Sequence, residues 1–222
     1  MANLYRVIRS DPEPLIEMLT KLQNDHKKDK SKTFYQVRDY DKDPNWGNFD
    51  LAFKAARTVY LNKTGFNGLF RVNKKGFFNV PLGRTISGKI PDIVQADKIR
   101  KLHDFLQTVE IRNLDFDEAV GDAVSGDVIY FDPPYDKPSE DPTEFTMYHK
   151  DGFGRDDLVR LKQTCDTLVN RGCNVIVSNN DTEFVRRLFT GYNFIEVETK
   201  RSINPESKTR RTGKELIIYK LN

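Results

Sequence analysis

Apolar residues in the first half of the chain recur at the spacing of amphipathic helices. Helices that bury one face against a core have this periodicity. The pattern predicts helices over residues 4–22, 49–61 and 93–106. We expect Asp11-Pro12 to break the first of them, because proline cannot continue a helix that has already begun. The polar stretch 24–32 is predicted to be a charged linker.

The second half changes to short apolar strands that alternate with helices, which is typical of a parallel α/β sheet. The pattern predicts strands at 109–113, 128–131, 174–178, 194–198 and 216–219, and helices at 116–124, 155–170 and 182–189. A chain of 222 residues can bury one substantial core with a smaller lobe. We therefore predict two regions, a helical and hairpin region over residues 1–107 and an α/β region over residues 108–222.

Residues 66–84 fit neither pattern. Gly and Asn alternate there with aromatic and apolar residues, which predicts a hairpin or loop built for surface contact. Five basic residues and no acid lie between Arg71 and Lys89, and six basic residues against Glu206 alone lie between Lys200 and Lys214. Such runs suit a nucleic-acid backbone. For any single run, a solvated face is the commoner explanation.

Composition bears on location and on metal binding. Hydrophobic residues make up 37% and charged residues 31% of the chain, and no run approaches the roughly 18 apolar residues of a membrane span. We expect no membrane partner, and without a secretory signal at residues 1–9 we expect a cytoplasmic protein. Cys165 and Cys173 have no nearby Cys or His that would complete a zinc set. Both are predicted to be reduced packing residues, and no metal site is expected.

The sharpest chemical signal is Asp132-Pro133-Pro134-Tyr135, which directly follows the strand predicted at 128–131. The carboxyl edge of an open α/β sheet is where ligands bind. The Asp132 carboxylate and the Pro133 carbonyl could both accept from a planar exocyclic amine and direct its lone pair at an electrophilic methyl, while Tyr135 stacks on the base. Two prolines restrict φ and remove backbone donors. An ordinary strand-ending turn is the alternative, and the tetrapeptide alone leaves the substrate open.

With further motifs, this turn resembles the Dam-type DNA adenine methyltransferases, which methylate adenine in GATC. The resemblance extends over nearly the whole chain. Its other motifs are GFNGLFRVN at 65–73, GFFNVPLGR at 76–84, FTMY at 145–148, SNN at 178–180 and RSI at 201–203. The resemblance implies a Rossmann-like S-adenosylmethionine-dependent methyltransferase sheet, with a mainly helical DNA-recognition lobe and double-stranded DNA as partner.

The most specific part of the resemblance is the hairpin that reads DNA. It implies that Arg71 contacts a guanine, that Leu69 and Pro81 touch the thymine methyl, and that Asn67 faces the base left behind when adenine is flipped out. Phe66 would insert into the duplex, where the family often has Tyr. Asn73 and Arg84 belong to the same set of expected DNA contacts. Arg is the best bidentate partner of guanine, and an adenine must leave the stack to reach Asp132.

The resemblance also implies a cofactor site for S-adenosylmethionine. Asp115, with Phe116 beside it, would bind the adenosyl part, and Asp132 would lie next to the reacting methyl group. Taken without the family, Asp115 is predicted to be the N-cap of the helix at 116–124, which is the commoner role for such an Asp.

One departure from the family concerns the cofactor. Dam-type enzymes begin with a Lys-bearing glycine segment, a strand and a Phe-x-Gly-x-Gly turn, and this sequence has no match to them. The sheet is therefore expected to be incomplete, with a partner chain as one source of the missing strands. An unpaired sheet edge favours pairing with another chain. The alternatives are a catalytically inactive or split-enzyme DNA-binding subunit, and a methyltransferase for RNA or protein glutamine.

Overall fold

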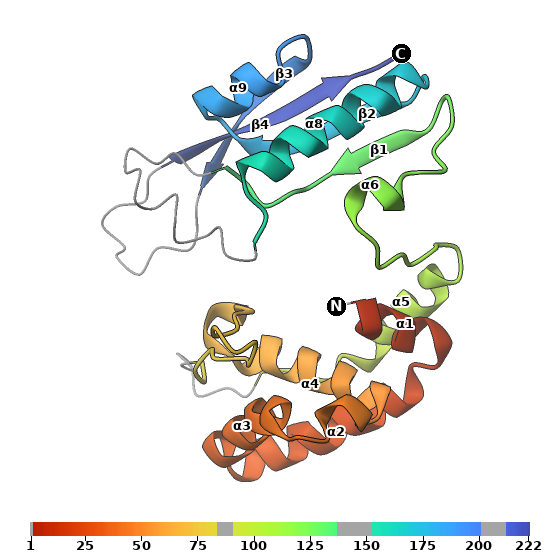
Figure 1. Cartoon of the computed structure of the whole chain (residues 1–222). Coiled ribbons are helices and arrows are strands. Elements are labelled where there is room, and N and C mark those ends of the chain that lie inside the picture. Colours follow the sequence, from red (N-terminus) through yellow and green to blue (C-terminus); the bar gives the residue numbers. More distant parts are fainter. Residues whose placement is uncertain (1, 84–90, 137–151, 201–211) are drawn as a thin grey trace. The chain divides into compact units, whose positions relative to one another are not determined.

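The structure, a computed structural model, describes residues 2–83, 91–136, 152–200 and 212–222 (Figure 1). It consists of two compact units, Met1–Asn113 and Leu114–Asn222. The division lies a few residues beyond the expected one at 107/108, because Val109 and Ile111 pack against the core of the first unit. Within the described ranges, no helix has both the length and the apolar character needed to cross a membrane.

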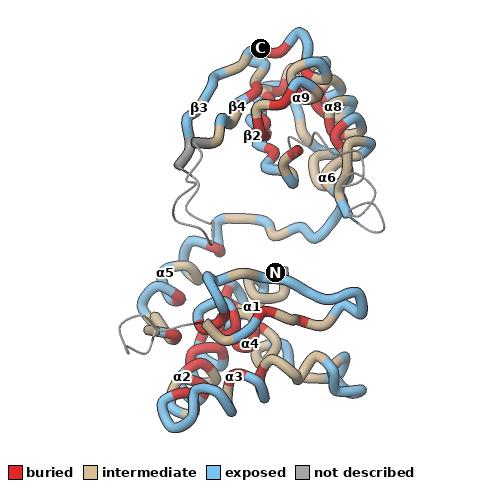
Figure 2. The backbone as a smooth tube through the Cα atoms, turned by 90° about the vertical axis from the view of Figure 1, so that its left-hand side faces the viewer, coloured by how far each residue is buried: buried red, intermediate tan, exposed pale blue. Residues whose placement is uncertain are grey.

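The first unit is helical, as predicted. Its elements are α1 (Ala2–Ser10), α2 (Glu13–Lys28), α3 (Lys30–Asp39), η1 (Tyr40–Lys42), η2 (Trp46–Asn48), α4 (Leu51–Thr64), η3 (Phe66–Gly68) and α5 (Ala96–Leu106). The expected break separates α1 from α2, and Asp50 caps α4 by accepting from the backbone N–H of Phe53 at 3.0 Å. Leu15, Leu19 and Tyr60 are fully buried, and the helices that carry them, α2 and α4, pack together. Figure 2 shows buried stretches on both helices.

The charged linker predicted at 24–32 is wrong. Helix α2 continues to Lys28, and α3 starts at Lys30 after Asp29, whose carboxylate accepts from the backbone N–H of Lys32 at 2.9 Å. His26 is buried on the inner face of α2, where its Nδ1 lies 2.7 Å from the hydroxyl of Tyr60. The charges that suggested a linker lie in the last turns of α2, at Asp29 between the two helices and in the first turn of α3.

The second unit is an α/β layer, which confirms the predicted class. Its elements are α6 (Phe116–Ala119), β1 (Val128–Phe131), α8 (Arg155–Asn170), β2 (Asn174–Asn180), α9 (Glu183–Leu188), β3 (Asn193–Lys200) and β4 (Thr212–Lys220). The strands lie in the order β1-β2-β4-β3. Helices α8 and α9 cover the same face of the sheet (Figures 1 and 2). Their apolar residues pack there with those of the strands, and the core includes both cysteines, which are buried and free as predicted.

Three details of the prediction are wrong. Strands β1, β2 and β3 run in the same direction, but β4 lies between β2 and β3 and is antiparallel to both. A parallel connection from β3 to β4 would need a dozen or more residues, and 201–211 is shorter. Residues 109–113 form no strand; two of their side chains turn to the helical core instead. Helix α6 ends at Ala119 rather than 124, just before Gly121, a poor helix former.

Candidate functional site

The predicted catalytic turn lies at the carboxyl end of β1, next to the end of β2. Ser178 of β2 donates its hydroxyl to Asp132 Oδ1 at 2.8 Å, and the hydroxyl of Tyr130 donates to Ser178 Oγ at 2.9 Å. The structure thus brings one oxygen of Asp132 into a short hydrogen-bond chain. Asp132 itself is exposed, so its other oxygen can accept from a ligand.

Tyr135 lies half-buried beside this chain of hydroxyls. Burial raises its pKa, a hydrogen bond with Ser178 lowers it, and the negative charge of Asp132 raises it again, with a net rise. The phenol is therefore neutral near pH 7. An uncharged ring is a suitable stacking surface for a nucleobase.

Asp136, the residue after the turn, was not identified from the sequence, yet it is the most heavily bonded residue here. Its carboxylate accepts from Arg155 at 2.9 and 3.2 Å and from the Thr182 hydroxyl at 2.7 Å. Its backbone N–H donates to Asn179 Oδ1 at 2.8 Å, and its carbonyl accepts from Asn180 Nδ2. This buried cluster, which we call the Asp136 network, fixes the far end of the turn.

A sequence signal for this network did exist. The motif Ser178-Asn179-Asn180 ends a predicted strand, as the Asp-Pro-Pro-Tyr turn does. Neighbouring parallel strands present their carboxyl ends at one edge of a sheet. That the two motifs lie close together could therefore have been predicted from the sequence, but the individual bonds could not be read from the spacing.

Asp115 is neither a simple helix cap nor a free carboxylate. It occupies the N-cap position of α6 without a side-chain capping bond. Instead, Arg160 of α8 donates to both of its oxygens, at 2.7 and 3.1 Å, and to Asp117 at 3.0 Å. The hydrogen bond from Arg160 lowers the pKa of Asp115 to about 2. Sequence reasoning did not identify Arg160, which lies 45 residues from Asp115 along the chain.

The residues at this position fit an adenosyl group in part. The side chain of Asp115 is 48% exposed, and each carboxylate oxygen has a second lone pair that can accept from a ribose hydroxyl or an amino group. Phe116 fits less well as a stacking surface. The Arg160 guanidinium lies over its ring, 4.1 Å from the centroid, and the ring packs against Phe131 and Phe153. Phe116 therefore supports Asp115 as a packing residue.

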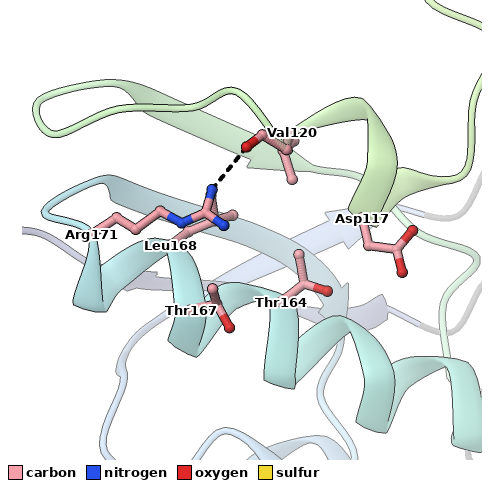
Figure 3. Close-up of a pocket in the computed structure, with 7 residues that line it drawn as sticks. Asp117, Val120, Thr164, Thr167, Leu168 and Arg171 are labelled. Carbon is pink, nitrogen blue, oxygen red and sulfur yellow. Dashed lines mark hydrogen bonds between the residues drawn. The ribbon is translucent and has the colours of Figure 1, made fainter.

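A small cavity lies beside this cluster, between α6 and α8 (Figure 3). Its volume is about 200 Å³, and Arg171 donates to the carbonyl of Gly121 at 3.0 Å on one of its sides. Cofactor pockets usually measure roughly 300–1,000 Å³. Neither Asp115 nor Asp132 lines the cavity, so it is separate from the predicted cofactor residues.

The predicted DNA-reading hairpin is present in the helical unit and is closed at its base by glycines. Gly65 pairs with Leu82, and the N–H of Gly83 donates to the carbonyl of Thr64 at 2.8 Å. A Cβ on Gly83 would lie 3.0 Å from two backbone oxygens, and one on Gly65 would lie 2.6 Å from the carbonyl oxygen of Leu61. The missing side chains thus let Gly83 approach the opposite strand closely and let Gly65 lie against the end of α4.

Alternation along the second strand of the hairpin separates core residues from outward-facing ones. Phe78 and Val80 are buried in the helical core, whereas Pro81 is exposed and Asn79 half-buried. On the first strand, Arg71 is exposed. The alternation follows from the period of two in extended chains. It leaves Pro81 and Arg71, two predicted DNA contacts, accessible.

The other expected DNA contacts differ in their placement. Phe66 is 38% exposed and Asn67 is exposed with a left-handed backbone, φ 52°. Leu69 is half-buried against the helical core. Asn73 has a structural task, since its Oδ1 accepts from the N–H groups of Lys75 and Phe77 at 2.9 and 3.2 Å. Arg84 lies outside the described residues, as do the motifs at 145–148 and 201–203.

Comparison with known proteins gives a consistent result. The model of the family described as D12 class N6 adenine-specific DNA methyltransferase matches residues 1–203. A type II methyltransferase of Lactococcus lactis subsp. cremoris is 35% identical over 98% of this chain and 75% of its own length. A type II methyltransferase of Methanocaldococcus jannaschii is 38% identical over 98% of this chain and 74% of its own length. A retron DNA adenine methylase of Escherichia coli is 32% identical over 98% of this chain and 71% of its own length.

Proposed function

Because the chain belongs to the D12 class N6 adenine-specific DNA methyltransferase family and is a DNA adenine-N6 methyltransferase, we propose that it methylates adenine in GATC. The adenine would be flipped out of the duplex, and the methyl donor would be S-adenosylmethionine. Catalytic roles fall to Asp132, Pro133, Pro134 and Tyr135.

The observation that carries this proposal is the state of the Asp132 carboxylate. One of its oxygens accepts from Ser178 at 2.8 Å, at the carboxyl end of β1, and the exposed side chain can offer the other to an amine. The Pro133 carbonyl supplies a second acceptor, because proline has no N–H to compete with it. Two acceptors can orient both N–H bonds of an amino group.

These residues act on a weak nucleophile. The lone pair of the adenine N6 amino group is delocalised into the ring, and acceptance of both N–H bonds makes the nitrogen more tetrahedral. When bound, S-adenosylmethionine supplies an electrophilic methyl group. Asp132 and Pro133 would hold N6 in line with it, while the neutral ring of Tyr135 stacks on the base. As the N–C bond forms, the bond from the methyl carbon to the donor sulfur would break, its electron pair would stay on sulfur, and one proton would pass from N6 to water.

The hairpin supports the proposed reading of the sequence. Arg71 is exposed on its outer face and suits a guanine edge, and Pro81 and Leu69 offer apolar surface to a thymine methyl. Phe66, which is part-exposed at the hairpin base, would fill the gap left by the flipped adenine, and Asn67 would face the base left without its partner. Asn73 would support this surface through the turn that it closes.

Methyl transfer to defined duplexes tests the proposal. We expect label from S-adenosylmethionine to enter a GATC duplex but neither a GTAC duplex nor one already carrying N6-methyladenine. Asp132→Ala should bind the GATC duplex with unchanged affinity and transfer methyl groups at least about 1,000-fold more slowly, because an amine acceptor is lost from the reaction centre. Normal turnover by this variant would overturn the assigned role of Asp132.

A second candidate function is a DNA-binding subunit without catalysis of its own. Arg160 already pairs with both oxygens of Asp115, the proposed cofactor ligand, and this favours the candidate. Isothermal titration with S-adenosylmethionine separates the two functions. Saturable binding that Asp115→Asn weakens supports the enzyme, whereas duplex binding without cofactor binding supports the subunit. Methyl transfer to RNA or protein but not to DNA would contradict both.

A further inference from the structure

Arg71 is held in place by the residue directly across the hairpin. Val72 pairs with Phe78, so Arg71 faces Asn79, whose backbone N–H donates to the Arg71 carbonyl at 3.0 Å. The side chains also meet. Arg71 Nε donates to Asn79 Oδ1 at 2.8 Å, and Nη2 reaches the Asn79 carbonyl at 3.4 Å.

These contacts use one edge of the Arg71 guanidinium and leave a second edge available to another acceptor pair. An arginine can bind a planar acceptor pair either with Nε and one terminal nitrogen or with its two terminal nitrogens. Asn79 takes the first edge, including its only Nε–H. The terminal edge, Nη1 with Nη2, points away from this contact and matches the O6 and N7 acceptors of guanine.

We propose that Asn79 is a specificity-determining residue that presets Arg71 to read guanine with its two terminal nitrogens. This inference rests on the proposed function, because it concerns the DNA surface of the same hairpin. Arginine has many rotamers, and a side chain already fixed before binding loses less entropy when it meets the base. Asn79 acts through Arg71 and is a positioning residue.

A buried ion pair fixes the strand that carries Asn79. Asp41 Oδ2 accepts from the backbone N–H of Phe78, next to Asn79, at 2.7 Å and lies 2.7 Å from Arg57 Nη2. The two charged side chains are only 10% and 8% exposed. Arg57 also donates to the carbonyl of Val37 at 2.9 Å. The hairpin backbone is therefore tied to α3, η1 and α4 at the residue beside Asn79.

The test uses a guanine that lacks one acceptor. Two duplexes are compared, one with the guanine of GATC and one with 7-deazaguanine, which has no N7, in its place. The Kd of each duplex is measured for the wild type and for Asn79→Ala. We expect the wild type to bind the 7-deaza duplex about tenfold more weakly, the effect of one good base contact. Asn79→Ala should bind the natural duplex about tenfold more weakly than the wild type does. Its affinity for the 7-deaza duplex should be little lower than its affinity for the natural one.

Asn79→Asp keeps an acceptor for Nε and should retain the discrimination against 7-deazaguanine. Asn24→Ala, an exposed asparagine on α2, is the matched control and should behave as the wild type. If Asn79→Ala binds both duplexes more weakly but keeps the full tenfold difference, Asn79 has only a structural role and the inference is wrong. A wild type that binds GATC no better than GTAC would instead refute the proposed function itself.

Discussion

The hairpin of the helical unit and the turn at residues 132–135 of the α/β unit, which we call the acidic turn, are held in different ways. The described part of the hairpin has two isolated bridges, Gly65 with Leu82 and Val72 with Phe78. Its second strand is held to the helices by the buried Phe78 and Val80 and by one buried ion pair. The acidic turn follows a strand of a four-stranded sheet. The Asp136 network holds its far end through five separate hydrogen bonds.

The difference shows how each region tolerates change. In the hairpin anchor, removal of either partner of the Asp41–Arg57 pair leaves a buried charge without its counter-charge. Such a loss is strongly destabilising even where the apolar packing of the strand remains. Where several bonds share the task, the loss of one leaves the backbone in place and changes only the group that it oriented. A substitution in the hairpin anchor should therefore affect folding, and one beside the acidic turn should affect chemistry.

The largest expected effect follows from Asp41→Asn. It removes the charge that pairs with Arg57 and should lower the free energy of unfolding of the helical unit by about 3–5 kcal/mol, the usual effect of breaking a buried ion pair. Trp46 is the only tryptophan and lies in this unit. Its fluorescence during urea unfolding therefore reports on the helical unit directly.

The matched control is Asp25→Asn, an exposed carboxylate paired with Lys28. It should change the free energy of unfolding by no more than about 0.5 kcal/mol, as is usual for surface pairs. Equal unfolding midpoints for Asp41→Asn and Asp25→Asn would remove the distinction between the two regions.

An intermediate effect is expected for Ser178→Ala. It deletes the hydroxyl that holds Asp132 Oδ1 while the Asp136 network remains. We expect kcat to fall about tenfold, because a carboxylate that is free to rotate offers the amine a poorly oriented acceptor, whereas KM for DNA stays unchanged. Thr190→Ala, at an exposed turn residue just after α9, is the control in steady-state methylation assays. A rise in KM with kcat intact would show that Ser178 serves binding instead.

The smallest expected effect is a pH dependence confined to the helical unit. Burial, with a smaller contribution from Lys30, lowers the pKa of His26 from its ordinary value of 6.5. The unfolded chain then binds a proton more readily than the folded one, so this contribution to stability is present above pH 6.5 and is lost as the pH falls below it. Trp46-monitored urea midpoints at pH 7.5 and 5.0 measure the loss, and His26→Gln should reduce it. If the urea midpoint of His26→Gln falls between pH 7.5 and 5.0 as much as that of the wild type, the pH dependence belongs to other groups.

Much of the fold could be predicted because it depends on local pattern. The helix at 155–170 and the strand at 128–131 follow from the spacing of apolar residues, and both begin and end where predicted. The acidic turn was predicted to follow that strand, as the structure has it. The linker at 24–32 and the strand at 109–113 were wrong because the packing partner of each segment decided its conformation: Tyr60 for His26, and the helical core for Val109 and Ile111.

The sequence by itself determined that this chain is an α/β protein with a helical lobe, and it identified the acidic turn and the hairpin as the chemical features. Only the tertiary structure decided which residues hold those features in place. Asp41 meets Phe78 across 37 residues, and Ser178 meets Asp132 across 46. Periodicity along a chain reports which face of an element is buried, but a hydrogen bond between distant residues depends on how whole elements pack, and local pattern carries no record of that.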